Sequence, residues 1–187
     1  YKTMWFRLLL AALLIVLVLW YWRLWRLQAR KREFDRAVNY FANSKFGNNN
    51  VEDILWDIAH NVITRTDLVD CVVYLIDESS GMLVQRSAFG EKNPREYLIK
   101  NPIRIPVGQG IVGAVAQSGK TEIVNDTTRD SRYILDEKPN YSEMAVPILF
   151  DGKVLGVIDS EHPDKRFFKK DHQDLIEAIA GITSTKL

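Results

Sequence analysis

The chain has 187 residues, 47% of them hydrophobic, and a formal net charge of +1 at pH 7. This length suits one ordinary domain with some additional sequence and is short for two domains. The near-neutral balance, without interleaved basic and aromatic residues, excludes a polyanion-binding protein, and we expect no nucleic-acid partner. The single cysteine, Cys71, excludes an internal disulfide framework and a cysteine-based zinc site.

The first long segment is apolar. Between residues 4 and 22 the only charged residue is Arg7, and aromatic residues lie at both ends of the segment. About 20 apolar residues in a helix span the hydrocarbon core of a bilayer, and aromatic residues are enriched at both lipid–water interfaces. A signal peptide would show a basic start and a small-residue cleavage site, which are not evident here. The pattern predicts a transmembrane helix over residues 4–22, with a lipid bilayer as its partner.

A basic cluster follows this segment directly and consists of Arg23, Arg26, Arg30, Lys31, Arg32 and Arg36. Only Lys2 and Arg7 lie before the apolar segment or at its start. The positive-inside rule therefore places the C-terminal side in the cytoplasm. The same cluster could contact anionic lipid head groups, but a topology signal is its ordinary role.

Residues 23–43 continue as a predicted linker helix with a different apolar period. Its apolar positions alternate at spacings of three and four residues, with one lysine among them: Leu24, Leu27, Lys31, Phe34, Val38 and Phe41. This is the a/d seam of a coiled coil and favours a parallel homodimer. One helix lying on its own domain is the alternative, because the seam covers fewer than three heptads. Residues 44–50, with one glycine and three asparagines, are predicted to end the helix.

Residues 44–187 have the pattern of one folded domain. Asn50 is a suitable N-cap for a helix whose apolar face runs from Val51 to Val62. Hairpin patterns follow, because 71–76 and 82–89 read as strands on either side of a turn, and Asp151-Gly152 is a strong hairpin signal. The other predicted elements are strands at 103–105, 122–124, 143–150 and 153–161, a helix at 111–117 closed by Gly119, and a last helix from about 170. We therefore expect an α+β fold with a largely antiparallel sheet.

Several blocks of this domain resemble the GAF family. They are Ile105–Gly113, Gly119–Thr121, Val124–Asp126, Asp130–Tyr133, Ser142–Ile148, Gly152–Ser160 and Phe168–Asp171. The resemblance covers roughly residues 45–187 and keeps the order of the family. It implies an antiparallel sheet with a ligand cavity on one face and helices on the other. It also implies dimers that form through the first and last helices.

The order of an apolar span, a basic linker and this domain resembles bacterial sensor histidine kinases. That second resemblance implies that the chain is a fragment. Residues 1–3 would end a periplasmic region, and a kinase would follow the last helix. It also implies a single-pass protein of the bacterial inner membrane. We expect a cytoplasmic sensory or relay module that binds a small ligand or relays a conformational signal through a dimeric helical bundle.

Polar residues in the GAF-like blocks are the candidate ligand-binding set, because in the family these blocks edge the cavity. The set is Asn125, Asp126, Ser142, Glu143, Asp159, Ser160 and Glu161. Their carboxylates could bind an amine or amide of a small, unidentified ligand. The alternative is that they cap turns and strand ends, as Asp and Ser often do. If side chains fill the cavity, the domain is a purely structural dimerisation module.

The sequence gives less support to a nucleotide, metal or cofactor site. Gly108-x-Gly110-x-x-Gly113 matches the dinucleotide pattern without a parallel βαβ unit, so the glycines are expected to serve a turn and helix packing. The three histidines are too scattered for a metal site, and we expect no metal and no cofactor. His162 is expected in a surface loop and His172 facing solvent.

One branch of the GAF family, the free methionine sulfoxide reductases, uses more than one cysteine. This chain has Cys71 alone, on an apolar strand. We therefore expect no catalytic residues and no enzyme activity, with such a reductase kept as the alternative.

Overall fold

The computed structural model describes residues 2–43, 50–90, 97–99, 102–135 and 138–187. The chain divides into two compact units, residues 1–40 and residues 41–187, and each is described by itself. The predicted helix end at 44–49 lies outside the described residues.

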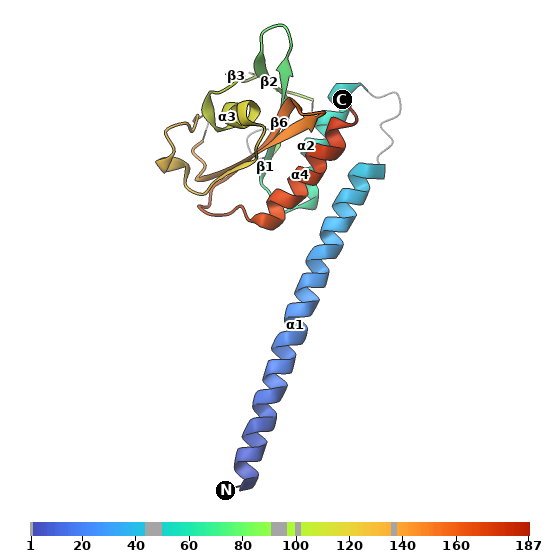
Figure 1. The fold of residues 1–187 in the computed structure, drawn as a ribbon, viewed down its shortest axis with the longest axis vertical. Coiled ribbons are helices and arrows are strands. Elements are labelled where there is room, and N and C mark those ends of the chain that lie inside the picture. Colours follow the sequence, from blue (N-terminus) through green and yellow to red (C-terminus); the bar gives the residue numbers. More distant parts are fainter. Residues whose placement is uncertain (1, 44–49, 91–96, 100–101, 136–137) are drawn as a thin grey trace. The chain divides into compact units, whose positions relative to one another are not determined.

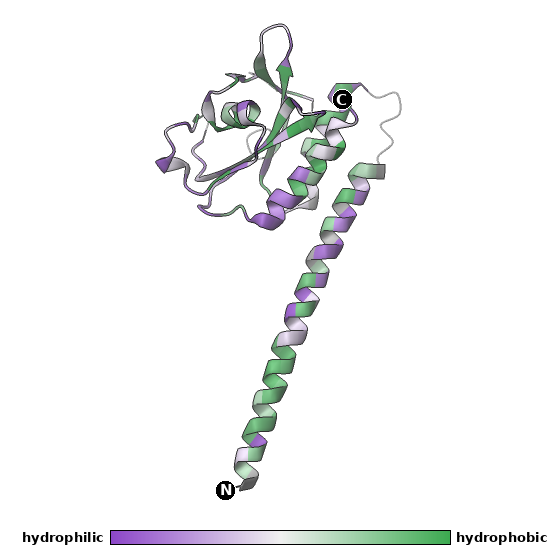
Figure 2. Ribbon diagram, viewed as in Figure 1, coloured by the Kyte–Doolittle hydropathy of each residue, from purple (hydrophilic) through white to green (hydrophobic). Residues whose placement is uncertain are grey.

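The first unit consists of most of helix α1 (Lys2–Asn43, 42 residues). The predicted span and the predicted linker are thus one continuous helix. Figure 2 shows an apolar first half and a mixed second half. The helix is long and apolar enough to cross a membrane, and no part of its apolar window is buried within the chain. A signal sequence or a helix of a soluble protein would meet the same criteria of length and composition.

The described residues of the second unit form a sheet, three further α-helices and one 3₁₀ turn. In chain order they are α2 (Val51–Arg65), β1 (Asp70–Asp77), β2 (Met82–Gly90), β3 (Arg104–Pro106), α3 (Gly110–Ser118), β4 (Glu122–Val124), η1 (Thr127–Arg129), β5 (Ser142–Phe150), β6 (Lys153–His162) and α4 (Lys170–Ser184). The strand order is β3-β2-β1-β6-β5-β4, and every pairing is antiparallel. The α+β prediction is confirmed.

Local sequence signals account for several element ends. The Asn50 side chain accepts a hydrogen bond from the backbone N–H of Asp53 at 2.9 Å, which caps α2. Asp151 and Gly152 both have positive φ, 47° and 78°, as a two-residue hairpin of type I′ requires. The hairpin between β5 and β6 therefore forms where the sequence predicts it.

The two faces of the sheet pack against different helices. Residues paired across strands share a face, so Tyr74, Ala145 and Val157 lie on the face that α3 covers. Their neighbours Val73 and Ile158 point to the opposite face, where α2 and α4 pack (Figure 1). We call these the α3 face and the helix-pair face. Because side chains alternate along each strand, consecutive residues serve different layers.

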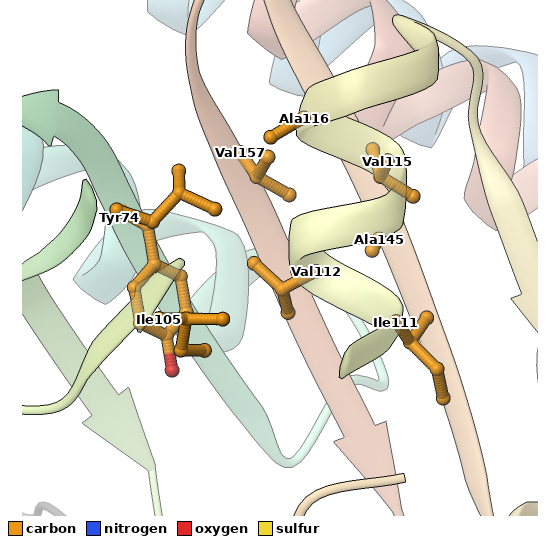
Figure 3. Close-up of a cluster of buried hydrophobic side chains, with 9 residues drawn as sticks. Tyr74, Ile105, Ile111, Val112, Val115, Ala116, Ala145 and Val157 are labelled. Atoms are coloured by element: carbon orange, nitrogen blue, oxygen red, sulfur yellow. The ribbon is translucent and has the colours of Figure 1, made fainter. Parts of the chain in front are cut away.

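A buried apolar cluster joins α3 to the sheet (Figure 3). Ile111, Val112 and Val115 of α3 are at most 5% exposed, and they pack with Tyr74 of β1 and Val157 of β6. Removing this apolar area from water holds α3 on the sheet. The position of α3 matters because its N-terminal end borders the pocket described next.

Candidate functional site

A small pocket lies between α3, β3 and the α3 face of the sheet. Its volume is about 40 Å³. Its lining residues are Tyr74, Ile103, Ile105, Ile111, Val112, Ile134, Glu143 and Glu161. A cavity needs on the order of 10–15 Å³ to hold one water molecule, so this pocket admits a small chemical group rather than a large ligand. Most of its wall is apolar, and both of its charged lining residues are acidic.

Four buried carboxylates gather at this end of the α3 face. Glu143 pairs with Glu161 across β5 and β6, and Asp159 pairs with Val72 of β1. By alternation, Asp70 of β1 lies on the same face as Val72. All four side chains belong to residues that are between 4% and 8% exposed. The arrangement concentrates negative charge in a poorly solvated place.

Burial and the charges of this group shift the pKa of Tyr74. Burial raises the pKa of its hydroxyl well above the ordinary value, and the charges of Asp159, Asp70, Glu161 and Glu143 raise it further. The phenol is therefore a neutral hydrogen-bonding group at physiological pH. The pocket offers an incoming ligand carboxylates and a neutral hydroxyl.

Hydrogen bonds hold part of this cluster in place. Asp70 Oδ1 accepts from the backbone N–H of Glu161 at 3.1 Å, and Glu161 Oε2 accepts from the Asn140 side-chain amide at 2.8 Å. Asn140 also donates its backbone N–H to the Tyr133 hydroxyl at 3.1 Å. The acidic cluster is thus connected to the segment between β4 and β5.

We call residues 125–135, the described first part of that segment, the lid. Ile134 of the lid lines the pocket. Gly110, the first residue of α3, lies directly beneath it, because a Cβ added at Gly110 would come within 2.6 Å of Ile134 Cδ1. Gly110 also has a φ of 68°, which favours glycine. The absence of a side chain at this position allows the lid to close over the pocket.

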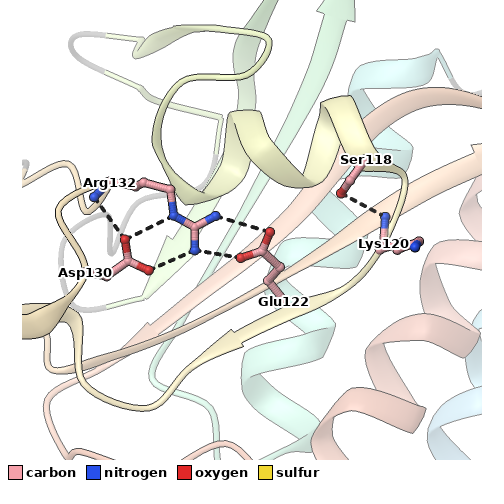
Figure 4. A network of polar contacts seen from close by, with 5 residues as sticks. All are labelled: Ser118, Lys120, Glu122, Asp130 and Arg132. Carbon is pink, nitrogen blue, oxygen red and sulfur yellow. Dashed lines mark hydrogen bonds and ion pairs between the residues drawn. The ribbon is translucent and has the colours of Figure 1, made fainter.

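Arg132 fastens the lid to the sheet (Figure 4). Its guanidinium donates to both carboxylate oxygens of Glu122 on β4, at 3.3 and 2.8 Å. It also contacts both oxygens of Asp130, at 3.0 and 2.8 Å. The hydrogen bonds with Asp130, followed by those with Glu122, raise the pKa of the guanidinium. The hydrogen bond from Arg132 lowers the pKa of Asp130. The clamp is charge-assisted and planar, which is the geometry in which arginine binds carboxylates well.

The structure brings together three of the seven predicted site residues, Glu143, Asp159 and Glu161. The other four lie elsewhere and have structural partners. Asp126 caps η1 and pairs with Lys165 at 2.9 Å, and the Asn125 carbonyl accepts from the Arg166 N–H. The remaining two are Ser142 and Ser160.

Ser142 and Ser160 lie on the opposite side of their strands from the carboxylates. Ser142 pairs with His162 and donates its hydroxyl to the Asp164 carbonyl at 2.7 Å. Ser160 donates its hydroxyl to the Asp70 carbonyl at 2.6 Å. Both hydroxyls satisfy backbone groups, the role that short polar side chains often have at strand ends.

Sequence reasoning missed Asp70, Tyr74 and Ile134 as site residues. An acidic residue at the start of a buried strand was the available signal for Asp70, since such a group needs a reason to be buried. Tyr74 and Ile134 carry no comparable signal. They reach the pocket through pairings between residues far apart in the chain.

Two histidine predictions were wrong. His162 was expected in a surface loop, but it is the last residue of β6 and is 7% exposed. His172 was expected to face solvent, but its side chain is 16% exposed and its Nε2 lies 3.3 Å from Asp67 Oδ1. Both rings stack on Phe167, with centroid distances of 3.5 and 5.0 Å. Aromatic packing explains why both are buried.

Cys71 is fully buried on β1, and by alternation it lies on the helix-pair face, away from the pocket. Burial raises the pKa of its thiol, and the charges of Asp70 and Asp159 raise it further. The thiolate, which is the nucleophile and metal ligand, is therefore disfavoured. Within the described residues no group of three or more His, Cys, Asp or Glu side chains is placed so that it could hold a metal ion.

Comparison with known families gives one match that covers most of the chain. The sequence profile of the family described as "GAF domain" matches residues 48–186. Solved structures show the same fold. The GAF domain of a phosphoenolpyruvate-protein phosphotransferase from Acinetobacter superposes with a TM-score of 0.71 at 19% identity, covering 84% of this chain and 91% of that one.

The reductase branch also appears among the similar proteins. The free methionine-R-sulfoxide reductase of Neisseria meningitidis, solved with its substrate, has a TM-score of 0.69 at 21% identity and covers 84% of this chain and 87% of that one. At this identity the similarity shows the fold alone.

Two curated relatives match over shorter stretches. Protein YtsP of Bacillus subtilis is 36% identical over 66 residues, which are 35% of this chain and 40% of the relative. The free methionine-R-sulfoxide reductase of Saccharomyces cerevisiae is 37% identical over 79 residues, which are 42% of this chain and 44% of the relative. The chain thus spans less than half of the length of these relatives.

These relatives contradict the prediction that the chain is not an enzyme. Free methionine-R-sulfoxide reductases are among its neighbours in both sequence and structure, and they are enzymes. The prediction rested on the number of cysteines, which is too narrow a criterion to separate this chain from them.

Proposed function

The chain belongs to the GAF domain family, and from this premise we propose that residues 48–186 form a sensory domain that binds a small amine-bearing metabolite. The pocket beneath the lid is the binding site. Glu143 and Glu161 receive the ammonium group, and the isoleucine-rich wall contacts the apolar part of the ligand.

The observation that carries this proposal is that two buried carboxylates, Glu143 and Glu161, line a pocket with an apolar wall, with two further buried carboxylates on the same face of the sheet. An ammonium group placed among them gains coulombic energy in a low-dielectric setting, whereas an anion would be repelled. If the ligand binds the open and closed conformations of the lid with different affinity, its binding would shift the equilibrium between these conformations. The volume of about 40 Å³ fits the cationic group, and a larger ligand requires Ile134 to move.

The first test is a thermal-shift titration of the full chain in a non-ionic detergent, which covers the exposed apolar surface of α1. The probes are methylammonium, free methionine and free methionine-R-sulfoxide, with acetate and a cyclic nucleotide as anions. We expect one or more amines to raise the melting temperature saturably. A ligand at 100 times its Kd stabilises the folded state by about 2.7 kcal/mol.

Matched variants locate the binding. Glu143→Gln should abolish the rise, because it removes a buried charge and keeps the shape of the side chain. Asp151→Asn, an equal change of charge in an exposed hairpin turn, should keep the rise. No rise with any amine, or an equal loss in both variants, would refute the amine proposal and favour the purely structural module.

A free methionine-R-sulfoxide reductase is the second candidate function, favoured by the 37% identity to the yeast reductase over 79 residues. The substrate named in that title is an amino acid, so its ammonium group suits the same carboxylates. In thiol chemistry, the sulfoxide oxygen passes to a thiol, and a second thiol releases it as water. Cys71, the only cysteine of this chain, is buried on the face away from the pocket, so external thiols would have to supply both thiol groups.

An assay separates the two candidates. The full chain is incubated with free methionine-R-sulfoxide and dithiothreitol, and the methionine formed is measured by chromatography. Turnover above the thiol-only background that disappears in Glu143→Gln supports the reductase. Saturable binding without methionine formation above the thiol-only background supports the sensor alone.

We further propose that the domain works in a bacterial signalling receptor. Its apolar helix would cross the inner membrane through residues 4–22, and residues 23–43 would form a dimeric linker. A histidine kinase after α4 is the effector that this order of segments suggests. The apolar character of α1 and the arginine-rich segment that follows it support the membrane part of this proposal.

A further inference from the structure

A second, larger depression lies on the other face of the sheet, at its β2–β3 edge. Its volume is about 500 Å³, and it is open to solvent. It is lined by Glu52, Trp56, Val84, Gln85, Arg86, Tyr97, Ile99, Pro102 and Arg104. We call it the edge groove. Ligand sites commonly have volumes of roughly 300–1,000 Å³, so the edge groove is large enough for a small organic molecule.

Two arginines come together in the edge groove because of the strand pairing. Arg104 of β3 pairs with Val84 of β2, and Arg86 follows two residues later on the same strand. A β-bulge interrupts the pairing of β2 with β1 at Arg86. Gln85 lies opposite Tyr74, and Ser87 lies opposite Val73. Arg86 therefore has no partner residue on β1. Bulges redirect side chains in this way and recur beside functional sites.

Both guanidinium groups are available to a ligand. Arg86 and Arg104 are exposed, and neither makes an ion pair or side-chain hydrogen bond with any residue in the described part of the chain. One carboxylate, that of Glu52 in the first turn of α2, also lines the groove. Two cations against one anion leave the described lining net positive. Arginine pairs are suited to oxyanions, since each presents several donors in one plane.

The opposite wall of the groove is aromatic. Trp56 of α2 is 2% exposed, and Tyr97 packs on it with ring centroids 5.3 Å apart and planes inclined by 31°. Tyr97 itself is 59% exposed. Its φ of 58° is unusual for a bulky residue. The result is an aromatic surface that faces solvent beside Arg86 and Arg104.

We propose that the edge groove binds a small ring-bearing oxyanion, with its phosphate or carboxylate at Arg86 and Arg104 and its ring against Tyr97. This site goes beyond the amine pocket, because it lies on the opposite face and selects the opposite charge. The domain would then bind two ligands of different chemistry, one on each face of the sheet.

Calorimetric titration of the full chain in non-ionic detergent and phosphate-free buffer tests this proposal. Phenyl phosphate and benzoate are the probes for the two oxyanions, inorganic phosphate lacks the ring, and benzyl alcohol lacks the charge. We expect saturable binding of phenyl phosphate, benzoate or both, weaker binding of inorganic phosphate and none of benzyl alcohol. The tighter of the two ring-bearing probes identifies the oxyanion.

Variants assign the binding to the groove. Arg86→Gln and Arg104→Gln should each weaken it about tenfold, the typical effect of losing one charge-assisted contact. Tyr97→Ala should reduce phenyl phosphate to the affinity of inorganic phosphate. Arg129→Gln removes an equally exposed charge on η1 and should change nothing. The arginine cluster after residue 22 stays intact in all of these variants, so it cannot account for a difference.

Three results would overturn the inference: no saturable binding of either ring-bearing anion, equal weakening in Arg129→Gln, or equal binding of benzyl alcohol. Arg104→Lys guards against a folding defect, because it keeps the charge and should retain part of the affinity. Glu143→Gln should leave anion binding unchanged, so failure of the amine pocket and failure of the edge groove remain distinguishable.

Discussion

At the scale of single residues, the geometry of His172 is that of a neutral ring. Its Nδ1 accepts the backbone N–H of Lys169 at 3.3 Å, a bond that a protonated ring could not accept. Burial lowers the pKa of His172, and the positive charge of Lys169 lowers it further, whereas Asp67 and Asp171 oppose the shift. His162 is the remaining ionisable group that faces this ring.

This arrangement predicts an acid-sensitive domain. The pKa of His172 in the folded state is lowered from 6.5, so the unfolded state binds the proton more readily. The stabilising contribution is complete above about pH 6.5 and is lost as the pH falls toward the lowered value. We expect the melting temperature of the full chain to decrease over this window, measured by circular dichroism in detergent.

Two variants check the assignment to His172. His172→Gln should flatten the melting-temperature profile in this window, because it removes the titrating group and keeps a polar side chain. Asp67→Asn should steepen the profile, because it removes a charge that favours the protonated ring. An identical profile in His172→Gln and the unaltered chain would contradict the prediction.

At the scale of elements, the lid is held by polar contacts at its surface. The Arg132 side chain is 40% exposed, so solvent screens its ion pairs and their net contribution to stability is small. Their effect is local, because they fix the part of the lid that carries Ile134. The lid is therefore expected to open without global unfolding.

Arg132→Gln should show this separation. We expect the free energy of unfolding to change by no more than about 1 kcal/mol. Amide hydrogens of residues 127–133 should exchange markedly faster, as measured by hydrogen–deuterium exchange mass spectrometry of the full chain. Lys170→Gln breaks a more exposed ion pair on α4 and should leave lid exchange unchanged. Equal exchange in the Arg132 variant would show that the clamp does not hold the lid.

Local signals made much of the fold predictable from sequence. The Asn50 cap and the Asp151-Gly152 hairpin depend on residues close in the chain, so their patterns identify them. The position of the lid could not be predicted, because it depends on the contacts of Arg132 and Ile134 with other elements of the fold. The family pattern indicated Glu143 and Glu161, but it also included Asp126, which caps a turn in the structure.

At the scale of the whole molecule, the membrane and dimer predictions rest on α1. The proposed dimer seam ends at Phe41, which belongs to the compact unit of residues 41–187 and is 2% exposed within the chain. The seam available to a partner is therefore shorter than the sequence pattern indicates. The parallel homodimer stays a prediction, as does the cytoplasmic placement of the folded domain.

Cysteine labelling of the full chain in bacterial cells tests the topology. Cys71 is buried, so the unaltered chain gives little background. We expect Thr3→Cys to react with an impermeant maleimide in intact spheroplasts, and Glu78→Cys to react only after the membrane is permeabilised. The Glu78 side chain is 88% exposed, so protection by the fold cannot explain a missing signal. Labelling of Glu78→Cys in intact spheroplasts would refute the proposed orientation.

The strict alternation of β5 and β6 also has a practical value for protein engineering. Across residues 142–148 and 156–162, odd-numbered positions face the pocket side and even-numbered positions face α2 and α4. The proposed recognition residues thus all lie at odd-numbered positions, whereas the even-numbered positions serve packing against the helices. A library that varies only positions 143, 159 and 161 would sample new ligand chemistries while the even-numbered residues continue to specify the same scaffold.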